Sequence, residues 1–190
     1  MRRLIITENI TVDGVIDAAG GWFDPASGNA DVSDIEDEIA RQRASADAFL
    51  TGRVTFEAMR GYWTAQTDDD TTGIAEYLDR VAKYVVSNSL TDPEWEPTTI
   101  LHDVLDVELL KAERGGDIVC TGSIRLARGL IAARLVDEFR LFVYPVVLGK
   151  GERLFVEAED MSQLELVDAR PFRSGVVLLH YRTGGLDPVE

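Results

Sequence analysis

Short apolar runs alternate along the chain with segments whose apolar residues recur at helical spacing. The runs predict strands and the spaced segments predict helices. The predicted strands cover residues 2–8, 48–50, 84–87, 99–101, 118–121, 138–148, 164–169 and 175–181, and the predicted helices cover residues 31–46, 54–63, 103–114 and 123–135. This alternation favours a mainly parallel sheet with helices on both faces, and the two final strands favour an antiparallel edge. We therefore expect an α/β fold.

Two of the predicted strands end at a glycine that is followed by a helix. Gly52 ends the second strand, and Gly122 with Ser123 ends the run that begins at Ile118. Gly122 permits a tight turn, and Ser123 is suited to cap the helix. The first turn of a helix leaves N–H groups without intrahelical partners, beside the positive end of the helix dipole. The two junctions therefore predict binding of an anion such as a diphosphate.

The residues at these junctions, and at the end of a third strand, suit an extended ligand with several phosphates. Ligands of such sheets lie at the carboxyl ends of the strands. Arg53 is suited to bidentate phosphate binding, and a salt bridge to Glu57, one helical turn away, is its alternative. The residues of the third strand end could equally form only a turn. The candidates are Gly52, Arg53 and Thr55; Ser87, Asn88 and Ser89; and Gly122, Ser123 and Arg125.

Residues 11–30 form a predicted irregular loop that contains several glycines. Long loops of this kind are often functional. Trp22 within it either stacks on a ligand or anchors the loop. Cys120 ends an apolar strand and fits a small core residue. His102 and His180 have no pattern of ligands or catalytic partners around them, and no cluster of His, Cys and carboxylate has the spacing of a zinc site.

Charge and cysteine content narrow the classes of function. The 190 residues include 34 acidic and 19 basic side chains, for a formal net charge of −15. This balance argues against a nucleic-acid or anionic-membrane surface, since both bind through clustered Lys and Arg. The single cysteine excludes an intrachain disulfide framework and favours a reducing compartment. No stretch approaches the roughly 18 apolar residues of a membrane span. We expect one cytoplasmic domain over residues 1–190.

Four segments carry a resemblance to a known family: NITVDGVIDAAGG, ADAFLTGRVTFEAM, KYVVSNSL and TGSIRLARGLIAARLVDEFRLFVYPVVLGKGERLF. Together they resemble the dihydrofolate reductase superfamily, in the branch that contains the reductase domain of bifunctional riboflavin-biosynthesis enzymes. The resemblance covers nearly the whole chain. It implies a dihydrofolate-reductase-like three-layer αβα sandwich, with a mainly parallel mixed sheet and an antiparallel C-terminal edge. No deaminase-like segment precedes the matching region, so we expect a reductase alone.

The resemblance implies NADPH as cofactor and hydride transfer to an electrophilic C=N or C=O of a pyrimidine- or pteridine-like compound. The group most similar is 5-amino-6-(5-phosphoribosylamino)uracil reductase. The protein would orient the two rings and supply a proton. By this resemblance the cofactor contacts are Gly52, Arg53 and Thr55 near the adenosine phosphate, Ser87 and Asn88 beside the adenosine, and Thr121, Gly122, Ser123, Ile124, Arg125 and Leu126 at the diphosphate. The residues that border the nicotinamide and substrate are Val12, Asp13, Gly14 and Trp22.

The resemblance leaves the substrate and the catalytic acid open. Riboflavin reductases of this branch have a glutamate directly before the turn glycine, and Thr121 stands there in this chain. One alternative is a dihydrofolate or pterin reductase, in which Glu36 or Asp37 would reach the substrate. Another is a non-catalytic nucleotide- or flavin-binding protein of the same fold. The apolar segment 139–148 also makes a homodimer an expectation; the other expected partner is a small molecule.

Overall fold

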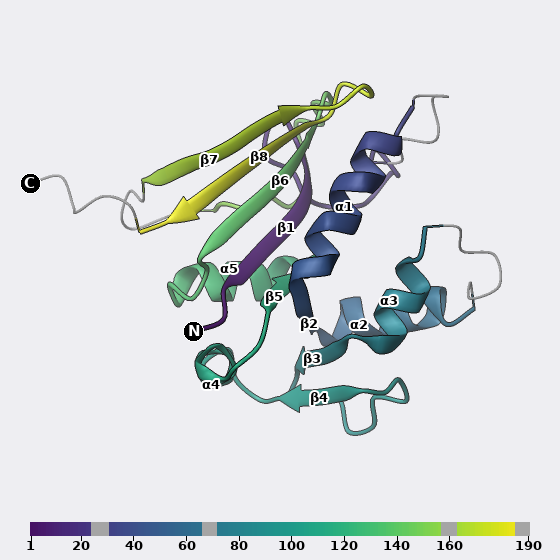
Figure 1. Ribbon diagram of the computed structural model, residues 1–190, viewed down its shortest axis with the longest axis vertical. Helices are drawn as coiled ribbons and strands as arrows, with labels where there is room; N and C mark the ends of the chain where they lie inside the picture. The colour runs from purple at the N-terminus through teal and green to yellow at the C-terminus, as the bar shows by residue number, and fades with distance from the viewer. Residues whose placement is uncertain (24–30, 66–71, 157–162, 185–190) are drawn as a thin grey trace, which may run out of the picture.

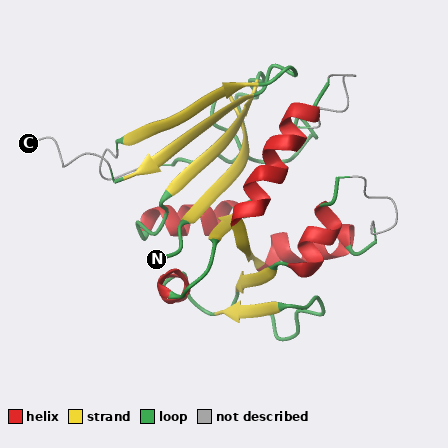
Figure 2. Ribbon diagram, viewed as in Figure 1, coloured by secondary structure: helices red, strands yellow, loops and turns green. Residues whose placement is uncertain are grey.

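The computed structural model contains one mixed sheet with helices on both of its faces (Figures 1 and 2). It describes residues 1–23, 31–65, 72–156 and 163–184. The strands are β1 (Leu4–Thr11), β2 (Ala46–Gly52), β3 (Ala82–Val86), β4 (Thr98–Leu101), β5 (Asp117–Cys120), β6 (Glu138–Tyr144), β7 (Leu164–Pro171) and β8 (Val177–Thr183). The helices are α1 (Ser33–Ser45), α2 (Arg53–Trp63), α3 (Ile74–Arg80), α4 (Asp106–Ala112) and α5 (Ile124–Ala132).

The order of the strands in the sheet is β4-β3-β2-β5-β1-β6-β8-β7. Neighbours from β4 to β6 are parallel, whereas β8 runs antiparallel to both β6 and β7. The predicted antiparallel C-terminal edge is therefore confirmed. Because β3, β2, β5 and β1 lie side by side and run in the same direction, their carboxyl ends meet along one edge of the sheet. The three strand ends chosen from the sequence are consequently neighbours.

Alternate residues of the strands pack on helices of opposite faces. In β2, Leu50 belongs to the apolar cluster that contains Leu110 of α4 and Leu130 of α5. Its neighbour Phe49 packs instead in a cluster with side chains of α2 and α3. The helix α1 covers the same face as α2 and α3, where Ile35 packs in a third cluster with residues of β6 and β8. Successive strand residues point to opposite faces, so these clusters confirm the three-layer sandwich.

The differences from the predictions include the bounds of two elements and one additional helix. β6 ends at Tyr144 and not at residue 148, because Pro145 follows and has no N–H to donate to a neighbouring strand. The predicted helix 103–114 is shortened to α4, since the carboxylate of Asp106 accepts the N–H groups of His102 and Asp103 and closes a turn before it. The helix α3 was not predicted at all. None of the helices in the described part of the chain has the length and apolarity needed to cross a membrane.

Candidate functional site

The two predicted glycine junctions meet at the carboxyl edge of the sheet. Thr55, in the first turn of α2, donates a hydrogen bond from Oγ1 to the carbonyl oxygen of Gly122 at 2.9 Å. In return, the backbone N–H of Gly52 donates to Oγ of Ser123 at 3.0 Å. β2 and β5 are adjacent, so these reciprocal bonds tie the start of α2 to the start of α5. We call the group formed by Gly52, Thr55, Gly122 and Ser123 the junction cluster.

The first turns of α2 and α5 carry no side-chain cap among the described residues. Ser123 occupies the N-cap position of α5, but its hydroxyl accepts the Gly52 N–H and makes no capping bond. The predicted capping role of Ser123 is therefore wrong. Gly52, at the N-cap of α2, has no side chain to offer. Two helix N-termini with uncapped N–H groups thus lie together, an arrangement that favours an anion.

Gly122 forms the tight turn between β5 and α5. Its φ of +67° lies in the left-handed region, which favours glycine because a Cβ is unfavourable there. A Cβ built at this position would lie 3.4 Å from Cγ2 of Thr55 and 3.9 Å from Cε of Met59. The glycine itself is exposed, whereas Ser123 beside it is buried. A ligand can therefore approach the backbone at Gly122 closely.

Arg53 forms the salt bridge that was the alternative to phosphate binding. Its Nη1 lies 2.9 Å from Oε2 of Glu57, and the two side chains are 42% and 37% exposed. A pair this accessible contributes at most about 1 kcal/mol. Exchange of the carboxylate for a phosphate therefore costs little, and both roles are compatible with the geometry. In the first turn of α5, the side chain of Arg125 is exposed.

The third strand end also adopts the arrangement expected of a turn. Oγ of Ser87 accepts the N–H groups of Ser89 at 3.1 Å and Leu90 at 3.0 Å. Asn88 is exposed. Gly52 pairs with Val86 in the sheet, so this turn lies next to the start of α2. The position suits the predicted adenosine contact, although the Ser87 hydroxyl is already engaged within the turn.

Thr51, near the end of β2, carries a buried hydroxyl group. The residue is only 1% exposed, and its Oγ1 has no hydrogen-bond partner within the described residues. Buried hydroxyls are normally bonded, because leaving one unsatisfied costs about 1–3 kcal/mol. Thr51 directly precedes the junction cluster. The two uncapped helix starts and the exposed left-handed glycine together favour an anionic ligand at this edge.

A carboxyl group that the sequence analysis overlooked lies beneath the glycine turn. Glu8, in β1, is 5% exposed, and its Oε1 accepts the N–H of Gly122 at 2.8 Å. Burial raises the pKa of Glu8 to about 8, and the hydrogen bond from Gly122 opposes this rise. The available signal was a single acidic residue inside an otherwise buried strand, since charged side chains are rarely buried without a partner.

The predicted substrate loop follows β1 and is joined by hydrogen bonds to the turn after residue 147. Asp13 accepts hydrogen bonds from Oγ1 of Thr11 at 2.7 Å, from N of Leu148 at 3.2 Å and from N of Gly149 at 2.8 Å. These bonds lower the pKa of Asp13 to about 2, with the Thr11 bond as the largest cause. The carboxylate therefore has a clear structural role. Val12 beside it is 63% exposed, and Gly14 adopts a φ of +83°.

Trp22 anchors the loop in the structure. Its Nε1 donates to the carbonyl oxygen of Asp17 at 2.6 Å. Its ring meets the rings of Tyr144 and Phe23 edge to face, each at a centroid distance of 5.5 Å. Of the two roles left open, the structure thus supports the anchor. The remaining loop residues 24–30 lie outside the described part.

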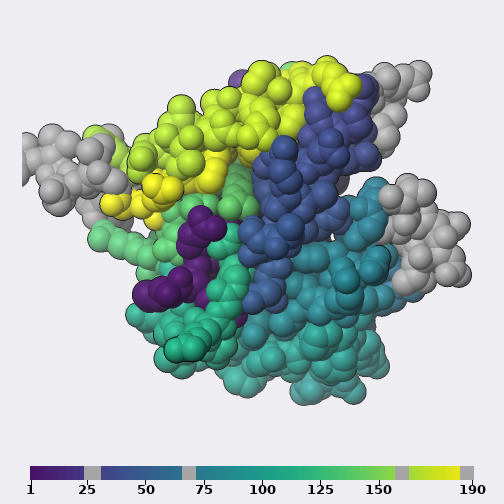
Figure 3. Space-filling view, in the orientation of Figure 1, coloured from purple at the N-terminus to yellow at the C-terminus, as the bar shows by residue number. Residues whose placement is uncertain are grey.

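The acidic residue of α1 that faces the sheet is Glu38. Glu36 and Asp37, the carboxylates required for the pterin alternative, are both exposed on α1. Glu38 is buried and accepts hydrogen bonds from Gln42 at 2.9 Å and Arg170 at 2.6 Å, in addition to Arg41. The space-filling view shows α1 lying across the surface beside the C-terminal strands (Figure 3). Helical spacing from Ile35 to Glu38 was the signal that could have identified this residue.

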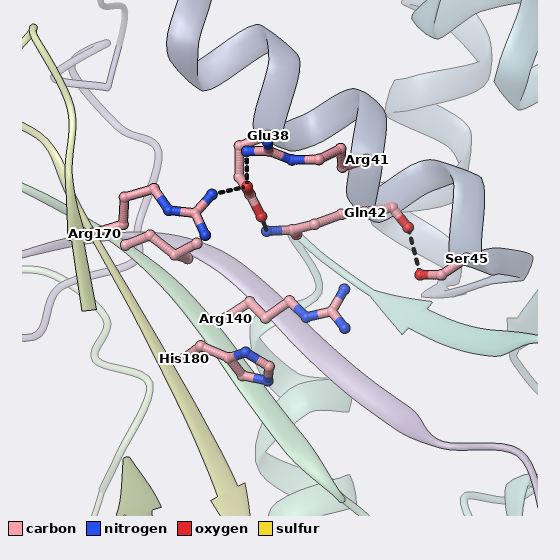
Figure 4. A pocket seen from close by; sticks show the side chains of 8 residues that line it. Glu38, Arg41, Gln42, Ser45, Arg140, Arg170 and His180 are labelled. Carbon is pink, nitrogen blue, oxygen red and sulfur yellow. Dashed lines mark hydrogen bonds and ion pairs between the residues drawn. The ribbon is translucent and has the colours of Figure 1, made fainter. Parts of the chain in front are cut away.

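A polar cavity of about 240 Å³ lies between the second half of α1 and the strands β6, β7 and β8 (Figure 4). His180 enters it from β8, where Nε2 lies 2.9 Å from Oε2 of the buried Glu138. Glu138 also contacts Arg3 and Arg140, at 2.9 and 3.2 Å. The basic side chains that line the cavity therefore have carboxylate partners. The lining residues are Glu38, Arg41, Gln42, Ser45, Arg140, Arg170, Leu178 and His180.

Comparison with known proteins agrees with this fold. Residues 2–178 match the model of the RibD C-terminal domain. The chain is 32% identical over 188 residues to YyaP, an uncharacterized Bacillus subtilis protein, covering 97% of this chain and 96% of YyaP. Solved structures share the fold at lower identity. One is a Shewanella sp. PV-4 protein provisionally described as acting in riboflavin biosynthesis, with a TM-score of 0.70, 18% identity, and coverage of 96% of this chain and 99% of that one.

A second structure is a deaminase/5-amino-6-(5-phosphoribosylamino)uracil reductase from Thermotoga maritima. Its TM-score is 0.65 at 14% identity, with coverage of 96% of this chain and 57% of that longer one. The family match spans nearly all of the present chain, and the strand order and three layers described above are consistent with it. The chain therefore belongs to the RibD C-terminal domain family, whose members include riboflavin-biosynthesis-type reductases.

Proposed function

We propose that this protein is an NADPH-dependent reductase that transfers hydride to a pyrimidine- or pteridine-like substrate. Its substrate group would be most similar to that of 5-amino-6-(5-phosphoribosylamino)uracil reductase. The observation that carries the proposal is the junction cluster, in which the uncapped starts of α2 and α5 are tied together by two hydrogen bonds. Family membership supports the reductase class.

Each part of the edge has a role in this proposal. The first-turn N–H groups at Ile124, Arg125 and Leu126 hold the diphosphate, with Gly122 allowing its close approach. Arg53 turns from Glu57 to the adenosine phosphate, and the turn at Ser87 and Asn88 borders the adenosine. Thr121 directly precedes the turn and lies at the same edge. Binding at a helix start gains from both the free donors and the dipole.

The loop after β1 closes the other side of the site. Val12 and Gly14 border the nicotinamide, while Asp13 keeps the loop fastened and Trp22 anchors its far end. Bound NADPH would supply the hydride, which an electrophilic C=N or C=O carbon of the substrate accepts. The protein holds the two rings in register and keeps water out of the space between them.

Titration of the purified protein with NADPH, NADH and flavin tests the cofactor assignment. We expect NADPH to bind, and we expect Gly122→Asp to weaken binding by at least tenfold more than the isosteric Gly122→Asn, because only Asp places a charge beside the diphosphate. The Asn variant controls for shape and for the left-handed backbone. Absence of NADPH binding by the native chain would refute the proposal.

A scan for substrate-dependent NADPH oxidation then tests catalysis. Pyrimidine and pteridine compounds with a reducible C=N or C=O are the expected substrates. NADPH binding without turnover of any of them would favour a non-catalytic nucleotide-binding protein. Flavin binding in preference to NADPH would favour a flavin-binding protein of the same fold.

A further inference from the structure

Glu8 is a buried carboxyl group that has no cationic partner among the described residues. Its Oε1 receives the Gly122 N–H at 2.8 Å, and the residue is 5% exposed. No ion pair joins Glu8 to another described residue. Glu8 lies within the central strand β1. A carboxylate in such surroundings is unfavourable, because burial removes its hydration and nothing of opposite charge replaces it. The uncharged acid is therefore favoured.

The charged groups around β1 do not compensate Glu8. Cys120, on the adjacent strand β5, is fully buried, and burial together with Glu8 raises the pKa of its thiol, so it remains neutral. Charged side chains on the elements around β1 are paired elsewhere or exposed: Arg53 pairs with Glu57, Arg128 with Glu152, Lys111 with Asp137 and Arg140 with Glu138, and Arg125 is exposed. A negative charge on Glu8 would thus act on the glycine turn without neutralisation.

We propose that Glu8 is a positioning residue that couples cofactor binding to the uptake of a proton. The inference rests on the proposed function, since it requires the diphosphate of NADPH to bind at the Gly122 turn. The backbone N–H of Gly122, which belongs to the turn, donates to the carboxyl group of Glu8. An ionised Glu8 therefore places a negative charge beside the turn and repels an incoming diphosphate. Protonated Glu8 still accepts the Gly122 N–H through its carbonyl oxygen and leaves the turn in place without the repulsion.

The size of the effect follows from the titration of Glu8 in the free protein, where burial raises its pKa to about 8. If the complex requires the protonated form, binding takes up about half a proton at pH 8 and about 0.9 at pH 9, and almost none at pH 6.5. By the same linkage, affinity for NADPH falls about tenfold between pH 7 and pH 9. Binding without this coupling would show neither change.

Isothermal titration of the native chain with NADPH measures the proton directly. Titrations at pH 8 and pH 9, each in two buffers of different ionisation enthalpy, give the number of protons taken up. We expect uptake that increases from pH 8 to pH 9. Binding with no uptake at pH 9 would overturn the inference and leave the proposed function intact, whereas no NADPH binding at any pH would overturn both.

Glu8→Gln separates the charge from the hydrogen bond, because Gln keeps an acceptor for the Gly122 N–H and cannot ionise. We expect this variant to bind NADPH with native affinity at pH 7, about tenfold more tightly than the native chain at pH 9, and without proton uptake. Glu165→Gln, on the outer strand β7, is the matched control and should keep the native pH dependence. An unchanged pH dependence in Glu8→Gln would overturn the inference, and if that variant does not fold, the uptake measured on the native chain decides.

Discussion

A pair of glycine-to-alanine substitutions tests the geometry of the junction cluster. Gly52 is the N-cap of α2 and Gly122 directly precedes the N-cap of α5, and their backbones differ. Gly122 has a φ of +67°, and its added Cβ would lie 3.4 Å from Thr55 Cγ2. Gly52 has a φ of −85° and a ψ of 160°, ordinary extended backbone, and its added Cβ would have no neighbour closer than 3.9 Å. Alanine is therefore compatible with one position only.

The expected magnitudes follow from this difference. At Gly122 the left-handed backbone costs an L-residue about 1–2 kcal/mol. For a chain of 190 residues this loss corresponds to a fall in Tm of about 2–8 °C. At Gly52, alanine reduces the freedom of the unfolded chain and should stabilise the protein by up to about 1 kcal/mol. The free energies of unfolding of the two variants should differ by about 2 kcal/mol.

Urea denaturation followed by circular dichroism gives both free energies, with thermal unfolding as the second measurement. Gly122→Asn is the informative third variant, because Asn tolerates the left-handed region better than Ala. Its loss of stability should be smaller than that of Gly122→Ala. Equal stability of the two alanine variants would refute the assigned backbone geometry at Gly122, regardless of what the site binds.

Two further predictions concern charged groups. Arg53→Ala should weaken NADPH binding by about tenfold or more and NADH binding much less, since loss of a charge-assisted phosphate contact costs about 1.5–3 kcal/mol. Fluorescence titrations measure both affinities. Equal losses of affinity for NADPH and NADH would exclude a contact between Arg53 and the additional phosphate of NADPH. Burial acts to raise the pKa of Glu138, but the hydrogen bond from His180 and the charge of Arg3 lower this pKa below its ordinary value of 4.5. Ionised Glu138 therefore stabilises the fold above pH 4.5, and this stabilisation is lost as the pH falls through the lowered pKa. Glu138→Gln should therefore cost about 3–5 kcal/mol at pH 7 and less near pH 3, and a pH-independent difference in urea denaturation would contradict this.

The sequence predicted the elements well where packing follows a regular period. Apolar spacing located α1, α2 and α5 to within a few residues, and the final strands indicated the antiparallel edge. Errors occurred where a local interaction ends an element: Pro145 stops β6, and the Asp106 carboxylate closes a turn before α4. The helix α3 is seven residues long, too short for periodicity to separate it from a loop.

The sequence by itself determined which residues can form the proposed phosphate-binding edge, because Gly52, Arg53 and Gly122 have backbone or side-chain properties that hold in any fold that places them after strands. Only the tertiary structure decided their partners. The order of β2 and β5 in the sheet brings Thr55 to Gly122 and removes the Ser123 hydroxyl from its expected cap. The packing of β1 in the centre of the sheet places Glu8 beneath the turn. Hydrogen bonds between residues distant in sequence depend on strand order and burial, and neither is encoded in local spacing.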